Sequence, residues 1–529
     1  MTLLSVRDLT LAIHGTPILD RVSFDMAEGE VFGLVGESGS GKSMTALALM
    51  RLLPRGAKVG GRALCEGTDL LRLSERRMCA LRGNEIGMIF QEPMTALNPV
   101  QTIGDQVAET LVIHGAASRS EALKVARQRL DRVGLIGERF PLSRYPHELS
   151  GGQRQRVCIA MAVALRPRLL IADEPTTALD VTTQTGILEL LRDLVETEGM
   201  GLMLITHDLA VVSGLANHVA VMQQGRIVEA GPTERLFRER KHDYTRRLFA
   251  AAAHQPQREP QARAEPLLEV ESATRDYLLP RPTPFAAHPV LRAVDGVSFT
   301  LHEGESLGLV GESGCGKSTL TRAILGLEPL QAGAIRLFGK PVGPQMPNAL
   351  RAGLQVVFQD PYGSFNPRHR VGRLISEPFH LMPAPPDDRR QRVAEALEAV
   401  GLRPDDAGKY IHEFSGGQRQ RIAIARALII RPDLIVLDEA VSALDVRVRA
   451  QILDLLADLQ QRYGLAYLFI SHDLSVVRAI TDRVMVMKAG KIVEEGATGA
   501  VFAAPTQRYT QELLAATPRI PAGWIEGDE

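Results

Sequence analysis

The chain is poor in the features that mark disulfide-rich, metal-clustered or nucleic-acid-binding proteins. Its 529 residues include only four cysteines, Cys65, Cys79, Cys158 and Cys315, and no two of them form a C-x-x-C pair. This argues against a disulfide framework or a metal cluster and fits a reducing cytosol. The net charge of −1 leaves no global basic field to hold nucleic acid. The remaining composition, 45% hydrophobic and 23% charged, is typical of a globular protein with substantial cores.

Long hydrophobic runs are also absent from the sequence. No stretch approaches the roughly 20 unbroken apolar residues that a membrane-spanning helix needs. The first ten residues, MTLLSVRDLT, include Arg7 and Asp8 and predict a β-strand, not a signal peptide. We therefore expect a protein with no membrane span of its own, which can still reach a membrane through a partner.

The two halves of the chain repeat each other. The segment GESGSGKSMT at 36–45 returns as GESGCGKSTL at 311–320, an offset of 311 − 36 = 275 residues. Later segments all return at an offset of 265, which indicates one rigid unit without insertions. These are ELSGGQRQRV (148–157), LLIADEPTTALDV (169–181), THDLAVV (206–212) and the pair Tyr244-Thr245, which returns as Tyr509-Thr510. The sequence therefore predicts a tandem duplication of one domain.

Composition predicts where the domains end. Segment 251–266, AAAHQPQREPQARAEP, lacks hydrophobic periodicity and is typical of a flexible, partly extended linker. We therefore predict a first domain at 1–250, a linker at 251–266, a second domain at 267–517 and a C-terminal tail at 518–529. The proline-rich stretch at 278–289 predicts an extended loop inserted early in the second domain.

Each half alternates short apolar runs with helical patterns. The runs VFGLVG, LLIADE and GLMLIT in the first half correspond to SLGLVG, LIVLDE and AYLFIS in the second. Continuous apolar strands interleaved with helices predict an α/β fold with a mainly parallel sheet that is buried on both faces. Buried helices are the alternative, but lengths of about six residues and flanking Gly and Asp favour strands.

A glycine-rich segment follows the first such strand of each half and opens a helix, as a phosphate-binding loop does. Its backbone N–H groups can surround a β-phosphate, and the helix N-terminus adds positive potential. We expect Lys42 and Lys317 to reach the β- and γ-phosphates, and the hydroxyls of Ser43 and Ser318 to ligate Mg²⁺. A glycine turn without a ligand is the alternative. The predicted nucleotide-binding residues are Gly36, Glu37, Ser38, Gly39, Ser40, Gly41, Lys42, Ser43 and Met44, and Gly311, Glu312, Ser313, Gly314, Cys315, Gly316, Lys317, Ser318 and Thr319.

Two adjacent acids end an apolar strand in each half, Asp173-Glu174 and Asp438-Glu439. One carboxylate can hold Mg²⁺ through water while the next polarises the attacking water. Alone, such a pair is often only a cap or a turn. Its place downstream of a phosphate loop favours the catalytic interpretation.

Two further elements complete each half. His207 and His472 follow the next strand, where a lone histidine would usually be structural, and their place after the acids predicts a γ-phosphate contact. The segments Ser150-Gly151-Gly152-Gln153 and Ser415-Gly416-Gly417-Gln418 each precede a helical run. Serine is a natural N-cap, and the free N–H groups behind it can bind an anion.

Together these elements resemble the nucleotide-binding domains of ATP-binding cassette (ABC) transporters, over nearly the whole chain except the linker and the last dozen residues. The resemblance implies two P-loop NTPase domains, each with an antiparallel β part and a helical subdomain beside the parallel core. It also implies a head-to-tail pairing in which each SGGQ segment closes the site of the other domain. The loops at Asp180 and Asp445 would run between the two sites.

The resemblance assigns each site a residue set. Site one combines Lys42, Ser43, Gln91, Asp173, Glu174 and His207 with Ser415, Gly416, Gly417 and Gln418. Site two combines Lys317, Ser318, Gln359, Asp438, Glu439 and His472 with Ser150, Gly151, Gly152 and Gln153. The implied Mg²⁺ ligands are Ser43, Gln91 and Asp173 in site one and Ser318, Gln359 and Asp438 in site two.

The two sites differ where the family stacks the adenine on an aromatic residue. The resemblance places Tyr277 there in the second half and Ile13 in the first. The missing ring costs on the order of 1 kcal/mol of stacking, so we expect site one to bind ATP more weakly. The change from Asp-Glu-Pro at 173–175 to Asp-Glu-Ala at 438–440 leaves both acids in place.

The phrases FQEPMTALNP (90–99) and FQDPYGSFNP (358–367) resemble the glutamine loops of the peptide, nickel and glutathione branch of ABC importers. This implies the ATP-hydrolysing subunit of a bacterial importer for di- or oligopeptides or glutathione. Its partners would be two transmembrane permease subunits and, through them, a solute-binding protein, at the cytoplasmic face of the inner membrane. No cysteine follows Cys315, so we expect no iron–sulfur cluster. The alternatives are a soluble two-cassette ABC protein acting on ribosomes or nucleic acid, and a fused sugar-importer ATPase.

Overall fold

The structure, a computed structural model, describes residues 1–177, 179–258, 265–279, 281, 285–360, 363–384, 386–442 and 444–524. It divides into two compact units. The first comprises Met1–Leu179, Thr183–Ala253 and Pro518–Glu529, and the second comprises Asp180–Thr182 and His254–Thr517. Parts of the predicted linker (259–264), the predicted tail (525–529), the predicted inserted loop (280, 282–284) and the second glutamine phrase (361–362) lie outside the described residues. The predicted domain boundaries therefore stay predictions.

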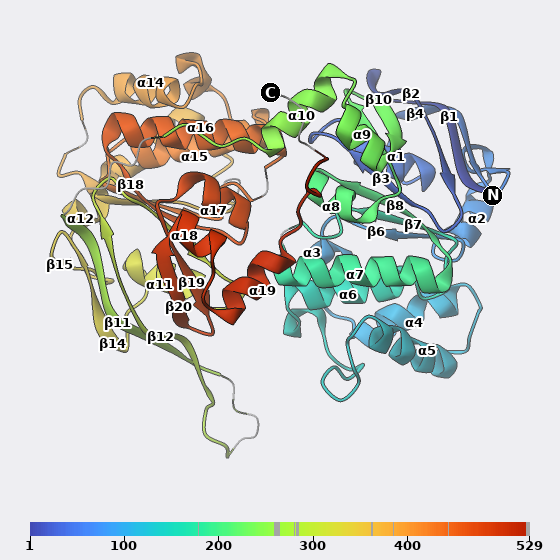
Figure 1. Cartoon of the computed structure of the whole chain (residues 1–529), viewed down its shortest axis with the longest axis horizontal. Helices are drawn as coiled ribbons and strands as arrows, with labels where there is room; N and C mark the ends of the chain where they lie inside the picture. The colour runs from blue at the N-terminus through green and yellow to red at the C-terminus, as the bar shows by residue number, and fades with distance from the viewer. Residues whose placement is uncertain are drawn as a thin grey trace. The chain divides into compact units, whose positions relative to one another are not determined.

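A six-stranded sheet forms the centre of the first unit (Figure 1). Its strands, in spatial order, are β10 (Arg226–Pro232), β9 (His218–Gln223), β3 (Val31–Val35), β8 (Gly201–Thr206), β7 (Leu169–Asp173) and β6 (Ile86–Ile89). All neighbours pair in parallel except β9 and β10, which are antiparallel. Every residue of β3, β7 and β8 is buried, as the continuous apolar runs predict for a sheet covered on both faces.

A four-stranded antiparallel sheet packs beside this core. Its strands, in spatial order, are β2 (Thr16–Ala27), β1 (Thr2–Ile13), β4 (Ala57–Cys65) and β5 (Thr68–Asp69). Leu4 of β1, Leu34 of β3 and Ala46 of the helix after β3 belong to one buried cluster. The antiparallel sheet therefore supports the strand and the helix that hold the glycine-rich loop.

The first half of the chain forms ten α-helices and two short 3₁₀-helices within its described residues. They are α1 (Lys42–Leu49), η1 (Leu70–Arg72), α2 (Glu75–Leu81), α3 (Pro93–Ala96), α4 (Ile103–Ile113), α5 (Arg119–Arg132), η2 (Pro146–Glu148), α6 (Gly151–Ala162), α7 (Val181–Glu198), α8 (Leu209–Leu215), α9 (Thr233–Glu239) and α10 (Asp243–Ala252). Helices α4, α5 and α6 share a buried cluster through Val107, Ala126 and Val157, and they form the helical part of the unit.

The second unit repeats this plan. Its six-stranded sheet has the order β16 (Leu354–Val357), β17 (Leu434–Asp438), β18 (Ala466–Ile470), β13 (Ser306–Val310), β19 (Arg483–Lys488) and β20 (Lys491–Ala497). Its antiparallel sheet has the order β12 (Val290–His302), β11 (Pro266–Leu278), β14 (Ala332–Leu337) and β15 (Lys340–Pro341). Its helices are α11 (Lys317–Ile324), α12 (Asn348–Ala352), α13 (Val371–Ile375), η3 (Glu377–Leu381), α14 (Arg389–Ala399), η4 (Pro404–Gly408), η5 (Ile411–Glu413), α15 (Gly416–Leu428), α16 (Val446–Tyr463), α17 (Leu474–Ile480), α18 (Thr498–Ala503) and α19 (Arg508–Ala516).

The predicted fold class is confirmed in both units: a mainly parallel sheet, an antiparallel sheet and a helical part. None of the helices in the described part of the chain combines the length and the apolar character that a membrane crossing requires.

The last described residues of the chain pack in the first unit. Ile520 and Trp524 lie against the buried cluster that contains Phe237 and Phe249. The indole of Trp524 meets the Phe237 ring edge-on, with 5.6 Å between the ring centroids. A guanidinium nitrogen of Arg238 donates to the carbonyl oxygen of Gly523 at 2.7 Å. This segment is therefore held by a mixed apolar and polar contact.

Candidate active sites

The glycine-rich loop of the first half connects the end of β3 to the start of α1. At Gly36 a Cβ atom would lie 2.2 Å from the carbonyl oxygen of Met222, so no side chain fits there. Gly41, the N-cap of α1, has φ +106°, a backbone conformation that favours glycine. Directly after it, Lys42 is 5% exposed, and its Nζ donates to the carbonyl oxygens of Gly36 (2.8 Å) and Glu37 (2.9 Å). The lysine therefore lies folded over its own loop.

The second half has the same loop geometry. The Nζ of Lys317 donates to the carbonyl oxygens of Gly311 (2.7 Å) and Glu312 (2.9 Å). A Cβ at Gly311 would again lie 2.2 Å from a carbonyl oxygen, that of Met487. The two loops are thus equivalent in backbone and lysine position.

The first acid of site one contacts the loop serine. Asp173, the last residue of β7, is 5% exposed, and its Oδ1 accepts a hydrogen bond of 3.0 Å from the Ser43 hydroxyl. Burial raises the pKa of Asp173 to about 6, although the Ser43 hydrogen bond opposes the shift. Two adjacent oxygen ligands at the mouth of a phosphate loop fit a Mg²⁺ ion, which prefers oxygen donors. These side chains therefore suit the expected metal.

The second acid, Glu174, contacts two other predicted residues of site one, Gln91 and His207. Its Oε2 accepts hydrogen bonds from the amide of Gln91 (3.0 Å) and the hydroxyl of Thr177 (2.8 Å). Its Oε1 lies 3.3 Å from Nδ1 of His207. Burial alone would raise the pKa of Glu174, but the His207 ring and the Thr177 hydroxyl bring it down to about 2. The carboxylate is therefore ionised at neutral pH and can accept a hydrogen bond from water.

The backbone also places Glu174 in an unusual way. Its φ is +49°, in the left-handed region, and its amide donates to the carbonyl oxygen of Ile205 at 2.9 Å. Glu439 in the second half repeats both features, with φ +50° and a 2.9 Å bond to Ile470. A non-glycine residue in this region carries strain that the surroundings must hold, which is common at functional sites.

Site two keeps the histidine contact but differs in other side chains. The Nδ1 of His472 lies 3.2 Å from Oε1 of Glu439. Burial alone would raise the pKa of Glu439, but the contact with His472 lowers it below its usual value. Burial and the charge of Glu439 raise the pKa of Asp438. Within the described residues, no hydrogen bond joins Ser318 to Asp438 or Gln359 to Glu439. The contact between the acid and the histidine therefore occurs in both halves, whereas the serine and glutamine hydrogen bonds are found, within the described residues, only in the first.

The SGGQ segments form the starts of α6 and α15. Ser150 and Gln153 make a reciprocal capping box, with bonds of 3.3 Å and 2.9 Å, and Ser415 and Gln418 make the same box at 3.5 Å and 3.0 Å. A Cβ at Gly152 would lie 2.2 Å from a methyl carbon of Thr183, so the helix start leaves no room for a side chain there. These described contacts are local, and the predicted closure of a site by the other domain stays a prediction.

The predicted adenine platform of site two already has partners. Tyr277, near the end of β11, donates its hydroxyl proton to Glu328 at 2.5 Å, and the Arg275 guanidinium lies 4.8 Å from the ring centroid. In the first half, Ile13 ends β1 and packs against the buried cluster of that unit. The two halves therefore differ between an aromatic and an aliphatic residue as predicted, and the weaker ATP affinity of site one stays a prediction.

Sequence reasoning missed two kinds of contact. The Thr177 hydroxyl donates a hydrogen bond to Glu174, but nothing in the sequence of the TALD segment (177–180) predicts this contact. The hydroxyls of Tyr244 and Tyr509 accept hydrogen bonds from the backbone of the two glycine-rich loops. The available signal was the Tyr-Thr pair that repeats at the constant offset of 265.

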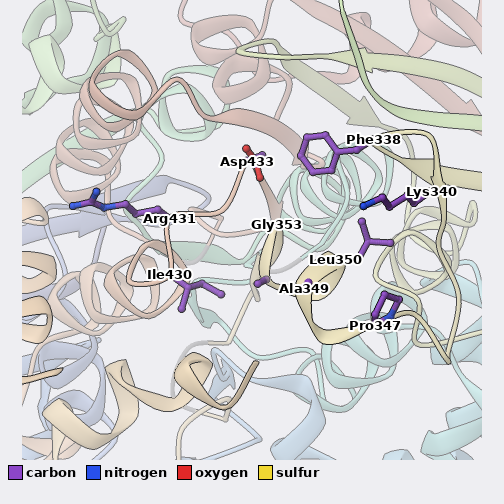
Figure 2. Close-up of a pocket in the computed structure, with 10 residues that line it drawn as sticks. Phe338, Lys340, Pro347, Ala349, Leu350, Gly353, Ile430, Arg431 and Asp433 are labelled. Atoms are coloured by element: carbon purple, nitrogen blue, oxygen red, sulfur yellow. The ribbon is translucent and has the colours of Figure 1, made fainter. Parts of the chain in front are cut away.

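A pocket of about 330 Å³ lies in the second unit, apart from the predicted site residues (Figure 2). It lies between the loop around Phe338 and Lys340, helix α12 and the chain segment from Ile430 to Asp433. None of its lining residues belongs to a predicted nucleotide site. The catalytic interpretation therefore rests on the loops and acids, not on this pocket.

Comparisons with known proteins identify the family of the chain. The model of the ABC transporter family matches residues 19–177 and 294–442. The chain belongs to the ABC transporter family. As an ABC ATPase it has two copies of the nucleotide-binding domain, which confirms the expected family, fold and enzyme class. A second family model, described as the oligopeptide/dipeptide transporter, C-terminal region, matches residues 493–529.

Two relatives are similar to this ABC protein over nearly their whole length. The peptidoglycan transport ATP-binding protein YejF of Agrobacterium fabrum is 50% identical over 534 residues, covering 98% of this chain and 97% of that protein. The glutathione import ATP-binding protein GsiA of Escherichia coli is 48% identical over 537 residues, covering 94% and 86%. Among solved structures, cbiO1 from Clostridium perfringens, part of the ABC transporter complex cbiONQ, is 30% identical with a TM-score of 0.40, covering 45% of this chain and 91% of that chain.

Proposed function

We propose that this ABC ATPase drives the import of a peptide or peptide-like solute, through ATP hydrolysis at two sites. The observation that carries the solute class is the match of residues 493–529 to the C-terminal region of oligopeptide/dipeptide transporters. The names of the two relatives, which refer to peptidoglycan transport and glutathione import, support this solute class. Both names refer to molecules that contain peptide bonds. These matches favour the peptide branch over a sugar-importer ATPase and over a two-cassette protein acting on ribosomes.

The residues of site one fit the hydrolysis of ATP to ADP and phosphate. Lys42 turns from its own loop carbonyls to the phosphates, and its charge stabilises them. Ser43, Asp173 and Gln91 would hold Mg²⁺, which would supply positive charge to the phosphate oxygens. Glu174, ionised at neutral pH, orients the attacking water and accepts its hydrogen bond.

His207 completes the site as a contact for the γ-phosphate. In the structure its ring lies against Glu174, so it is close to the place where the water and the phosphate would meet. Site two has the same functions at its matching residues, which are Lys317, Ser318, Gln359, Asp438, Glu439 and His472. Both sites keep the full set, and we infer that both hydrolyse ATP.

The two domains close on ATP as an intramolecular head-to-tail pair, and hydrolysis lets them open again. Ser150 to Gln153 then complete site two, and Ser415 to Gln418 complete site one. The segments that follow Gln91 and Gln359 contact two transmembrane permease subunits at the cytoplasmic face of the inner membrane. A solute-binding protein delivers the solute to the permease, so the solute itself does not contact this chain. ATP binding and hydrolysis thereby drive the closing and opening of the two domains.

Uptake by whole cells tests this function. A strain lacking the chain is complemented with the wild type or with the Glu174→Gln, Glu439→Gln double variant. Uptake of labelled tripeptides, glutathione and a cell-wall peptide is then compared. We expect the wild type to restore uptake of at least one of these solutes and the double variant to restore none. Uptake of all three that does not depend on the chain would contradict the proposal.

A further inference from the structure

A buried tyrosine of the last helix reaches the phosphate loop in each half of the chain. The hydroxyl of Tyr244, in α10, accepts a hydrogen bond of 3.1 Å from the backbone amide of Glu37. The hydroxyl of Tyr509, in α19, accepts one of the same length from the amide of Glu312. Tyr244 is 0% exposed and Tyr509 is 7% exposed. The same contact, across 207 and 197 residues of sequence, therefore exists twice.

This hydrogen bond acts on a peptide group that the loop lysine also holds. The amide of Glu37 and the carbonyl of Gly36 belong to one planar peptide unit. Tyr244 accepts from its N–H, and the Nζ of Lys42 donates to its C=O at 2.8 Å. The unit between Gly311 and Glu312 is held in the same way. Both ends of the first peptide of the phosphate loop are thus fixed by side chains.

The helices that carry the two tyrosines are themselves tied to the sheet. Glu229 of β10 accepts hydrogen bonds from the amides of Lys241 and His242, just before α10. Glu494 of β20 accepts from the amides of Thr506 and Gln507, just before α19. A hydroxyl on a helix fixed in this way has a defined position relative to the loop.

We propose that Tyr244 and Tyr509 are positioning residues that orient the first peptide of each phosphate loop for ATP. When the lysine leaves the loop carbonyls for the phosphates, the tyrosine hydroxyl still contacts that peptide. It keeps the loop open in the shape that receives the phosphates. This inference rests on the proposed nucleotide sites, and it gives the C-terminal segment of each domain a function in nucleotide binding.

The test removes only the hydroxyl, with Tyr244→Phe and Tyr509→Phe in the full chain. Each is combined with a lysine-to-alanine change in the other loop, Lys317→Ala or Lys42→Ala, so that one site binds. We expect the dissociation constant of trinitrophenyl-ATP in these one-site chains to rise about 2- to 10-fold, the range that one net hydrogen bond gives. In chains that keep both loop lysines, the KM for ATP should rise by a similar factor and kcat should change less than twofold, because the hydroxyl does not touch the reacting atoms.

Tyr467→Phe is the control, and it lies in the same unit as Tyr509. Tyr467 is also 0% exposed, and its hydroxyl donates to the carbonyl oxygen of Leu456 at 2.9 Å, away from the phosphate loop. It should lower the melting temperature without a change in KM. Tyr→Phe variants at 244 and 509 that bind ATP as the wild type does, or that change KM no more than Tyr467→Phe, would overturn the inference.

Hydrogen exchange gives a second measurement that does not depend on activity. In Tyr244→Phe and Tyr509→Phe, backbone exchange should become faster in the peptides that contain 36–42 and 311–317, and in few others. Unchanged exchange there would also overturn the inference. The proposed sites themselves are tested by the double Lys42→Ala, Lys317→Ala variant. If it still binds ATP, the nucleotide sites are wrong; if it does not, and the tyrosine variants behave as the wild type, only the tyrosine inference fails.

Discussion

The side-chain amide of Gln91 donates to Oε2 of Glu174 at 3.0 Å, across 83 residues of sequence. Gln91 lies two residues after Ile89, the last residue of β6, in the phrase that resembles the glutamine loop of peptide importers. The contact joins the segment proposed to face the permease to the acid proposed to orient water. An incoming γ-phosphate and its Mg²⁺ would compete for both groups, so nucleotide binding and the position of this segment are physically linked.

Loss of either catalytic acid should nearly stop ATP hydrolysis. We expect Glu174→Gln and Glu439→Gln each to lower the steady-state ATPase rate by on the order of 100-fold, because an amide cannot accept the proton of the attacking water. The effect should be similar for the two variants, since both sites keep a full residue set. Glu189→Gln, on an exposed position of α7, is the control and should hydrolyse ATP normally. A normal rate in either active-site variant would show that its site is not hydrolytic.

The two sites should bind ATP with different affinities. Tyr277 can offer a ring to adenine in site two, whereas Ile13 cannot in site one, and a stacking difference on the order of 1 kcal/mol corresponds to about fivefold. Titration of each site alone, with the other loop lysine changed to alanine, measures this. Ile13→Tyr should tighten site one, and Tyr277→Leu should weaken site two. A tighter site one in the otherwise native chain would contradict the prediction.

The ion pair between Arg449 and Asp473 should stabilise the second unit. Arg449, in α16, contacts the carboxylate of Asp473 at 2.7 Å, and both side chains are mostly buried. Burial opposes ionisation, but the Arg449 charge lowers the pKa of Asp473. Because the folded-state pKa is lowered, the stabilisation is present above the unfolded-state value near 4 and is lost as pH falls.

Arg449→Gln tests that pair, and glutamine already occupies the corresponding position 184 of the first half. We expect a loss of about 1.5 to 3 kcal/mol in the free energy of unfolding at pH 7, because the partly buried Asp473 carboxylate loses a charged hydrogen-bond partner but keeps the backbone amides of Ser475 and Val476. Arg462→Gln, which breaks an exposed pair with Asp458 on the same helix, should cost about 0.5 kcal/mol or less. Chemical denaturation at pH 7 measures both, and equal effects would mean that the buried pair contributes nothing special.

The cysteines should differ sharply in reactivity. Cys79 is exposed, whereas burial raises the pKa of Cys65 to about 11 and that of Cys158 to about 12. A thiol reagent at pH 8 should therefore modify Cys79 first, since the thiolate is the reactive form. Rapid modification of Cys158 in the folded protein would contradict this.

The same shifts predict how stability depends on pH. Above pH 9 the Cys158 thiol loses its proton in the unfolded state but keeps it in the folded state. Deprotonation therefore stabilises the unfolded state relative to the folded state. The free energy of unfolding should fall by about 1.4 kcal/mol per pH unit for this thiol between pH 9 and its folded-state pKa. Comparing the wild type with Cys158→Ser at pH 8 and pH 10 isolates this contribution from that of other groups. An identical pH slope in the two proteins would refute it.

The sequence predicted the parts of each site that are continuous in the chain. A glycine loop, an acid pair at a strand end and a serine N-cap act through local backbone geometry, so their residue types and spacing carry the information. The contact between Tyr244 and Glu37 could not be predicted, because it depends on where α10 packs after the whole sheet has formed. The same holds for the Arg275 contact on Tyr277, since nothing in the spacing of a strand shows which face of a ring is covered.

The position of Trp524 gives the protein a built-in optical probe. It is the one tryptophan of the chain, and its indole lies against Phe237 in the first unit. Tryptophan emission from the native chain therefore comes from a single ring whose surroundings are the C-terminal segment, α9 and α10. A shift of this emission to longer wavelength would report that the segment has left Phe237 and entered water. Because α10 also holds Tyr244, the same signal can be followed while ATP is added, without any label.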